Sequence, residues 1–251
     1  MKFSEEVAWV TGSSTGIGRA VAEALAREGR RVVVHYNASE EAAREVAGGI
    51  SSAGGEAMLV GGDVSDAGEV DRMVGEIEDR YGRLDVLVNN AGSLVERRTL
   101  AEMTEDLWDR VMDVNLKSVY LCSRAVLPLM KRRGAGRIIN LTSVAARNGG
   151  GSGSVAYATA KGGVSTLTRA MAKELVRENI LVNGVAPGII TTPFHDRFTP
   201  PEMRENFKNA IPIGREGTPE ETASVVSFLA SPAANYLVGE IIEVNGGQLM
   251  S

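Results

Sequence analysis

Tyr157 and Lys161 have the side-chain types and the spacing that proton transfer requires. They lie four positions apart at the start of a predicted helix, so their side chains share one face. A free phenol has a pKa of about 10, and a nearby ammonium favours the phenolate, which brings that pKa toward neutrality. Such a pair often marks only a solvated helix face, but this helix follows a strand that ends in Ser143. We therefore predict that the pair performs acid–base chemistry.

A glycine-rich turn with the pattern TGxxxGxG follows the first predicted strand, at residues 11–18. Its glycines, Gly12, Gly16 and Gly18, permit a tight turn and let the backbone approach a pyrophosphate, whose charge the N-terminal amides of the next helix stabilise. A glycine cluster alone is a weak signal, but here a strand precedes it and a helix follows it. We predict a dinucleotide-binding turn rather than a purely structural one.

The elements that must position these residues alternate along the chain. Short apolar runs rich in β-branched residues lie at 7–11, 31–36, 57–64, 84–90, 137–143 and 180–187, and stretches with helical periodicity separate them. Apolar strands flanked by helices predict an α/β fold, with a doubly wound parallel sheet covered by helices on both faces. Ligands bind such sheets at the carboxyl ends of the strands.

Composition and charge limit the classes of function. A chain of 251 residues with 43% hydrophobic content predicts a single domain that spans residues 1–251. The first ten residues carry two acids and no apolar run is long enough to span a bilayer, so we expect a cytoplasmic protein that does not bind membranes. Interspersed charges with a net charge of −5 give no reason to expect nucleic acid.

Three further features favour structural roles or exclude a site. Cys122 stands in an apolar helical stretch and is expected to be a buried small side chain. His35 and His195 lie far apart in sequence and belong to no ligand cluster, so we expect no metal. The glycine run 149–153 connects a strand to a helix and lacks the basic residue of a phosphate loop. We interpret it as a side-chain-free wall beside a substrate, not as a linker between domains.

Motifs along nearly the whole chain resemble those of the short-chain dehydrogenase/reductase family. Beside TGxxxGxG, Asp63-Val64 is similar to its adenine-contacting pair, residues 89–92 (NNAG) to its motif after the fourth strand, and residues 187–192 (PGIITT) to the segment that covers the nicotinamide. The resemblance implies a Rossmann fold of about seven strands and a nicotinamide cofactor. It places these residues at the cofactor: Gly12, Ser14, Thr15, Gly16, Ile17, Gly18, Tyr36, Asn37, Asp63, Val64, Asn90, Ala91, Gly92, Tyr157, Lys161, Pro187, Gly188, Ile190 and Thr192.

The same resemblance implies four catalytic residues. Tyr157 is the general acid in reduction and the base in oxidation, and Lys161 lowers its pKa and holds the nicotinamide ribose. Ser143 binds the substrate oxygen, and Asn115 completes a water relay to Lys161. A helix-interior amide bonded to backbone is the other interpretation of Asn115. Hydride then moves between the nicotinamide and a carbonyl carbon without a metal.

The end of the second predicted strand favours NADP over NAD. Relatives that prefer NAD usually carry an aspartate there, which binds the ribose hydroxyls and repels a 2′-phosphate. Tyr36 occupies that position, and Asn37, Ser39 and His35 could hydrogen-bond the phosphate. NAD stays open, because Thr15 stands where many NADP-using relatives have a basic residue.

Three segments are expected to line the substrate pocket, at 93–98, 145–154 and 192–212, with a substrate-loop insertion at about 190–215. They carry several arginines, an asparagine and a histidine but few large apolar residues, which favours a small polar sugar or keto acid. We name Ser143, Arg147, Gly150 and His195 as substrate contacts. Arginines in loops more often point into solvent, which is the alternative for Arg147.

Two other functions remain open from the sequence. Much of the chain resembles 3-oxoacyl-acyl-carrier-protein reductases, whereas GGGSG before Tyr157 looks closer to reductases of keto-deoxy-uronates. Relatives that bind a carrier protein tend to present a basic residue near the position of Glu178. A non-catalytic NADP-binding sensor or scaffold would show a broken Asn-Ser-Tyr-Lys set, and all four residues are present.

The resemblance also implies self-association. Relatives commonly pair two long helices, predicted here at 104–133 and 154–178, across a two-fold axis. Residues 239–247 resemble the strand that builds a second interface. We expect a homotetramer or a homodimer.

Overall fold

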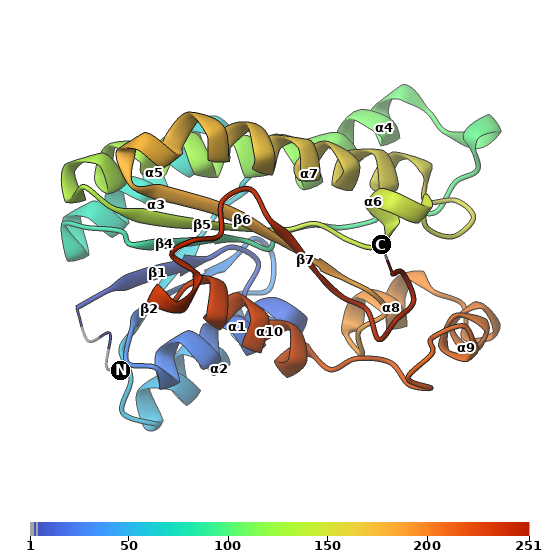
Figure 1. Cartoon of the computed structure of the whole chain (residues 1–251), viewed down its shortest axis with the longest axis horizontal. Helices are drawn as coiled ribbons and strands as arrows, with labels where there is room; N and C mark the ends of the chain where they lie inside the picture. The colour runs from blue at the N-terminus through green and yellow to red at the C-terminus, as the bar shows by residue number, and fades with distance from the viewer. Residues whose placement is uncertain (1–2, 4, 251) are drawn as a thin grey trace.

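A single seven-stranded parallel sheet forms the centre of the molecule, as the computed structural model of residues 3 and 5–250 shows (Figure 1). Its strand order is β3-β2-β1-β4-β5-β6-β7, so the direction of winding reverses between β1 and β4. Every neighbouring pair is parallel, which confirms the predicted fold class. The strands are β1 (Val7–Val10), β2 (Arg31–Tyr36), β3 (Ala57–Gly61), β4 (Val86–Asn89), β5 (Gly136–Leu141), β6 (Ile180–Pro187) and β7 (Ile241–Val244).

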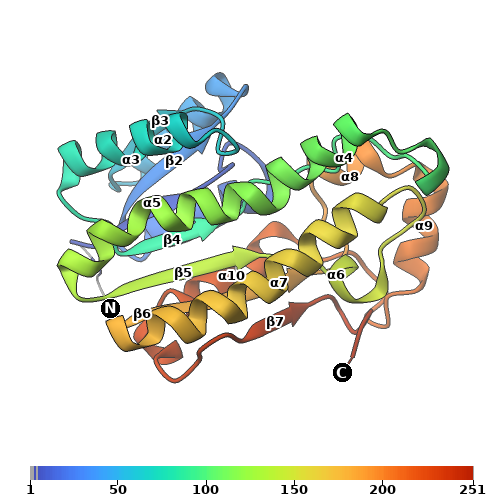
Figure 2. The ribbon, with the colours of Figure 1, turned by 90° about the horizontal axis from the view of Figure 1, so that it is seen from above.

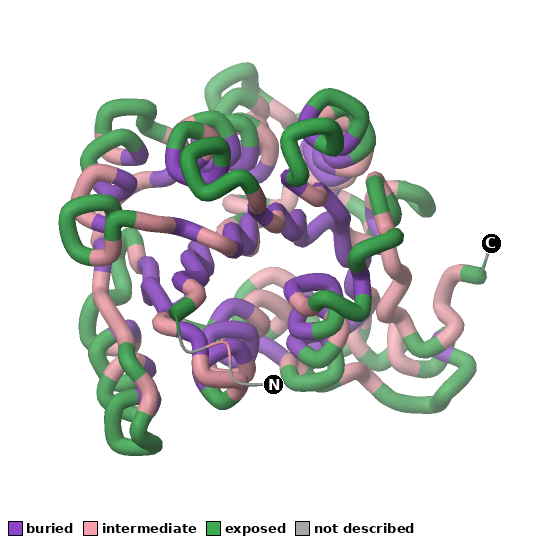
Figure 3. Tube along the Cα trace, turned by 60° about the vertical axis from the view of Figure 1, so that its left-hand side comes forward, coloured by how far each residue is buried: buried purple, intermediate pink, exposed green. Residues whose placement is uncertain are grey.

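Two helical layers cover the sheet, and their apolar faces form two buried clusters. One layer holds α1 (Gly16–Arg27), α2 (Glu40–Ser52) and α10 (Pro219–Leu229). The other holds α3 (Ala67–Tyr81), α5 (Ser118–Arg133) and α7 (Val155–Leu175), of which α5 and α7 run side by side (Figure 2). Burial is therefore concentrated in the strands and the inner helix faces (Figure 3). No helix within the described part of the chain is long and apolar enough to cross a membrane.

Shorter helices gather at one end of the sheet (Figures 1 and 2). They are α4 (Glu105–Met112), α6 (Ala145–Asn148), α8 (Pro193–Phe198) and α9 (Pro201–Asn209), and 3₁₀ turns occupy Leu100–Glu102, Val176–Glu178 and Pro232–Ala234. The predicted substrate-loop insertion is thus helical. Arg204 of α9 fastens it through ion pairs to Asp196 and Glu216, at 2.5 and 2.6 Å. The assignment of all 251 residues to one domain stays a prediction.

The helix predicted at 104–133 is interrupted. A π-helical turn at Asp113–Lys117 separates α4 from α5 and contains Asn115. A π turn inserts one residue into the helical repeat and so rotates the preceding segment relative to the following one. Each flanking segment has helical periodicity and no glycine or proline stands between them, which is why the sequence suggests one helix.

A chain of buried amides joins the central strands to the helices above them. Asn89 at the end of β4 donates to Asn140 of β5 at 2.8 Å and to Ser123 of α5 at 3.1 Å. Asn140 in turn donates to the hydroxyl of Thr168 in α7 at 2.9 Å. Because unpaired amides are costly to bury, these bonds specify how α7 sits on β5, three residues before Ser143.

His35, in β2, fastens the glycine-rich turn through both nitrogens of its ring. The amide of Gly12 donates to its Nδ1 at 2.8 Å, and its Nε2 lies 3.0 Å from the carbonyl oxygen of Gly62. Nδ1 is therefore the acceptor and Nε2 carries the proton. Burial lowers the pKa of His35 to about 4, although the Gly62 carbonyl and the charge of Asp63 oppose this shift. The predicted bond from this ring to a 2′-phosphate is thus ruled out by its two backbone partners.

The lowered pKa of His35 predicts that the fold loses stability in mild acid. Its value is about 4 in the folded state against 6.5 in the unfolded chain, so the unfolded state binds more protons between these limits and stability falls as the pH drops through this window. From about pH 7 to about pH 5 this residue alone accounts for about 2 kcal/mol. Urea unfolding of wild type and His35→Asn at both pH values checks this. The variant should be less stable at about pH 7 yet lose about 2 kcal/mol less on acidification, and an equal loss in both proteins would contradict the assignment.

Candidate active site

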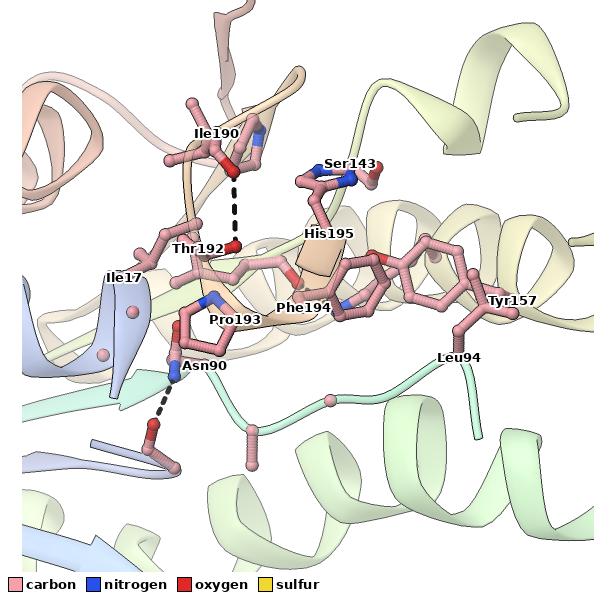
Figure 4. Close-up of a pocket in the computed structure, with 18 of the residues that line it drawn as sticks. Ile17, Asn90, Leu94, Ser143, Tyr157, Ile190, Thr192, Pro193, Phe194 and His195 are labelled. Atoms are coloured by element: carbon pink, nitrogen blue, oxygen red, sulfur yellow. Dashed lines mark hydrogen bonds between the residues drawn. The ribbon is translucent and has the colours of Figure 1, made fainter. Parts of the chain in front are cut away.

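A cavity of about 460 Å³ opens at the carboxyl ends of the strands. All nineteen residues predicted to contact a cofactor line it, from Gly12 in the first turn to Thr192 before α8. Three of the four predicted substrate contacts, Ser143, Gly150 and His195, also line it. Phe194, His195 and Tyr157 lie close together within it (Figure 4). Motifs that lie far apart in the sequence thus line one cavity.

The turn after β1 fits an anionic dinucleotide. No side chain caps the N-terminus of α1, and its first turn contains no acid, so its backbone amides remain available to a phosphate. A Cβ on Gly18 would lie 2.3 Å from the carbonyl oxygen of Gly12 and 2.5 Å from the side-chain nitrogen Nδ2 of Asn90. Gly12 itself has a φ of 62°, a left-handed conformation that favours glycine. Glycine is therefore required at both positions for the turn to pack against Asn90.

The end of β2 carries no acid in this structure. Tyr36, Asn37, Ala38 and Ser39 all line the cavity. The ring of Tyr36 covers Gly61 of β3, where an added Cβ would come within 2.6 Å of a ring carbon. The position that would hold a carboxylate is therefore filled by a neutral ring, and Asn37 and Ser39 supply polar groups beside it.

Tyr157 and Lys161 share one face of α7, as their spacing predicts. The ammonium of Lys161 lies 5.8 Å from the centre of the Tyr157 ring and donates to the carbonyl oxygen of Leu141 at 2.7 Å. Burial lowers the pKa of Lys161 to about 8. Burial also raises the pKa of Tyr157 to about 12, against the opposing effect of a hydrogen bond with Ser143. The direction for Tyr157 is opposite to the sequence-based expectation, because desolvation of the phenolate is the largest effect on this group.

Asn115 and Lys161 meet at Gly92, where a Cβ would lie 2.8 Å from Oδ1 of Asn115 and 3.3 Å from Nζ of Lys161. Only a glycine leaves room there. The side-chain amide of Asn115 donates to the carbonyl oxygens of Ser93 and Val111, at 2.6 and 2.9 Å, and accepts from the Ser93 amide at 3.1 Å. Its side chain is thus bonded to backbone, as the alternative interpretation of this residue expected, while its position beside Lys161 suits a relay.

The predicted substrate contacts divide into two groups. His195 lies in the cavity, accepts or donates a hydrogen bond with the Thr199 hydroxyl at 2.9 Å, and has a pKa lowered to about 4, mainly by burial. Arg147 lies outside the cavity lining, and its guanidinium is 3.4 Å from a carboxylate oxygen of Glu243. The structure therefore does not bring Arg147 to the site, since α6 turns it toward β7.

Several lining residues belong to the segments predicted to line the substrate pocket but were not named as substrate contacts. Leu94, Phe194 and Phe207 supply apolar surface, and the centres of the Phe194 and Tyr157 rings are 5.8 Å apart. Arg97 also lines the cavity. Aromatic residues in the segment 192–212 were a usable signal for a cavity wall. Nothing in the sequence shows which loop arginine turns inward.

Comparisons with known proteins agree with this geometry. The family model described as enoyl-(acyl carrier protein) reductase matches residues 12–248. The chain is 44% identical to a 3-oxoacyl-[acyl-carrier-protein] reductase of Synechocystis sp. over 99% of its length and 98% of the relative. It is 42% identical to the 3-oxoacyl-[acyl-carrier-protein] reductase FabG of Staphylococcus aureus over 100% of both chains. It is also 44% identical to the short-chain reductase protein NovJ of Streptomyces niveus, over 97% of this chain and 94% of the relative. The chain therefore belongs to the short-chain dehydrogenase/reductase family and is an NAD(P)-dependent oxidoreductase.

Proposed function

We propose that the chain reduces 3-oxoacyl thioesters to 3-hydroxyacyl thioesters with NADPH, as a 3-oxoacyl-acyl-carrier-protein reductase. End-to-end similarity to two proteins of that name carries the proposal. The sequence-based preference for a small polar sugar or keto acid gives way to its alternative, because the relatives match over the whole chain whereas the sugar-reductase likeness covers short segments. The apolar surface of Leu94, Phe194 and Phe207 also suits an acyl chain.

Tyr157 acts as the general acid in this reduction. A bound nicotinamide supplies the hydride that reduces the carbonyl carbon. The oxygen then gains negative charge, and a phenol with a pKa of about 12 is fully protonated at neutral pH and holds the proton that this oxygen needs. Ser143, which hydrogen-bonds Tyr157, orients the carbonyl oxygen toward it.

Lys161 and Asn115 resupply the proton and hold the cofactor. The ammonium of Lys161 is buried, and its bond to the Leu141 carbonyl directs it toward the floor of the cavity. From there it would hold the ribose of a bound nicotinamide and pass protons toward Tyr157. Asn115, which meets it across Gly92, positions the relay.

The proposed cofactor is NADPH because the end of β2 has no carboxylate to repel a 2′-phosphate. Asn37 and Ser39 are its proposed hydrogen-bond donors. A homotetramer is also proposed, since large apolar side chains are exposed on α5 and beside β7, where Tyr120 is 48% and Val238 43% exposed.

The substrate class is tested by following NADPH oxidation with acetoacetyl thioesters, keto-uronates and 2,5-diketo sugars. We expect kcat/KM for the thioesters to exceed that for the other two classes at least about tenfold. A preference for a keto-uronate or a diketo sugar would return the assignment to the sugar-reductase class.

The role of Tyr157 predicts a specific kinetic change in Tyr157→Phe. Loss of the proton donor should lower kcat by about 10²- to 10⁴-fold, while the dissociation constant for NADPH stays within about twofold. Single-turnover kinetics and fluorescence titration with NADPH measure the two quantities. Thr159→Ala, an exposed substitution two residues away on α7, should leave both unchanged. An active Tyr157→Phe enzyme would remove Tyr157 from the mechanism.

The cofactor preference is tested by placing a charge at the end of β2. Tyr36→Asp and Tyr36→Asn remove the same ring contact with Gly61 and differ only in charge. The ratio of kcat/KM for NADPH over NADH should fall at least about tenfold in Tyr36→Asp relative to Tyr36→Asn, because the carboxylate repels the 2′-phosphate. Equal ratios in the two variants, or a wild-type preference for NADH, would contradict the choice of NADPH.

A further inference from the structure

The part of the cavity beyond Tyr157 contains one positive charge that no acid balances. Arg97 follows the NNAG motif and lines this part together with Asn148, His195 and Phe207. The acid that lines the cavity among the described residues is Asp63, which follows β3 on the opposite side of β1. Among the described residues, no carboxylate lines the cavity beside Arg97.

The bonds of Arg97 go to neutral groups. Its guanidinium donates to the carbonyl oxygen of Ser152 at 2.8 Å and to that of Phe198. Burial alone lowers its pKa, without an acid to oppose the shift. Neighbouring arginines differ in this respect, since Arg98 is paired with Glu96 and Arg204 with Glu216.

His195 neither balances this charge nor adds to it at neutral pH. Burial is the main cause of its pKa of about 4, and the ring is neutral there. The charges of Arg204 and Arg97 also lower this pKa. Those of Glu216 and Asp196 oppose the shift. Arg97 is therefore the charge that an incoming substrate meets beyond the catalytic residues.

The guanidinium also stands where two covering segments meet. Ser152 belongs to the glycine run 149–153 and Phe198 ends α8. A Cβ on Gly151 would lie 2.9 Å from the ring of Phe207 and 3.7 Å from Nη1 of Arg97. Because Gly151 has no side chain, the ring of Phe207 and the guanidinium of Arg97 both pack close to its backbone, and both line the cavity.

We propose that Arg97 binds an oxyanion on the substrate, a carboxylate or a phosphate that is separate from the ketone, and so selects anionic ketones over neutral ones. A guanidinium bonds an oxyanion about twice as strongly as a neutral carbonyl, and its planar fork suits both groups. The inference rests on the proposed function for the class of ketone. Two sources fit the chemistry: the phosphate of a phosphopantetheine arm, or a carboxylate at the end of the acyl chain.

Three thioesters distinguish these sources. They are acetoacetyl-N-acetylcysteamine, which is neutral; acetoacetyl-phosphopantetheine, which carries a phosphate; and an N-acetylcysteamine thioester of a 3-oxo dicarboxylic acid, which carries a terminal carboxylate. For each enzyme, kcat/KM of either anionic thioester is divided by that of the neutral one. In wild type at least one ratio should exceed unity about tenfold and should decrease as ionic strength rises.

Arg97→Gln should reduce the raised ratio at least about tenfold, and Arg97→Lys, which keeps the charge but not the fork, should reduce it less. Arg98→Gln, the matched change at the paired neighbour, should leave the ratio as in wild type. Equal decreases of kcat/KM for all three thioesters in Arg97→Gln would mean that this residue only joins the glycine run 149–153 to α8. That result would overturn the proposal. Wild-type ratios near unity would overturn it as well.

Failure of the proposed function gives a different result. If wild type reduces no thioester, that function is wrong, and the role of Arg97 is decided by the same ratio for a keto-uronate over its methyl ester. A ratio that Arg97→Gln leaves unchanged would then overturn the inference.

Discussion

The contact between Thr11 and Asn90 is the constraint on which the site depends. It lies between β1 and β4, where the winding of the sheet reverses and the loops above the strands separate. The Thr11 hydroxyl donates to Val88 and accepts from the amides of Asn90 and Ala91, both at 3.0 Å, while the Asn90 side chain donates to the carbonyls of Thr11 and Gly12 at 2.9 Å. These bonds hold the turn after β1 and the loop after β4 at a fixed, short distance from each other.

The glycines follow from that contact. Because Asn90 lies so near the first turn, Gly18 cannot carry a side chain, and His35 fastens Gly12 from the other side. The neutral side chains of Asn90 and His35 thereby fix the shape of a backbone turn that suits an anion. A charged residue in either place would compete with the phosphate or repel it, which is a physical reason for an amide and a neutral imidazole here.

Much of this arrangement could be predicted from the sequence. The features that could not be predicted share one cause. Glycine spacing and the Tyr157–Lys161 interval are set by backbone geometry, which one chain segment determines locally, so both were found. The direction of Arg147, the inward turn of Arg97 and the pKa of Tyr157 depend on what distant segments place nearby. The π-helical turn at Asn115 has no clear local signal either, because no glycine or proline marks it and helix-forming residues continue on both sides of it.

Positively charged or partly positive groups lie at three separate places along the cavity. Backbone amides at the start of α1 have no side-chain cap, the buried ammonium of Lys161 lies near the phenol of Tyr157, and Arg97 lines the cavity as well. Desolvation lowers the pKa of Lys161 and raises that of Tyr157, so the ammonium is costly to bury and the phenol keeps its proton. An arriving oxyanion would stabilise the ammonium and accept a hydrogen bond from the phenol. In the proposed reduction, negative charge that develops on the substrate oxygen would therefore meet a proton donor and a buried cation that are already in place, so little reorganisation would be needed.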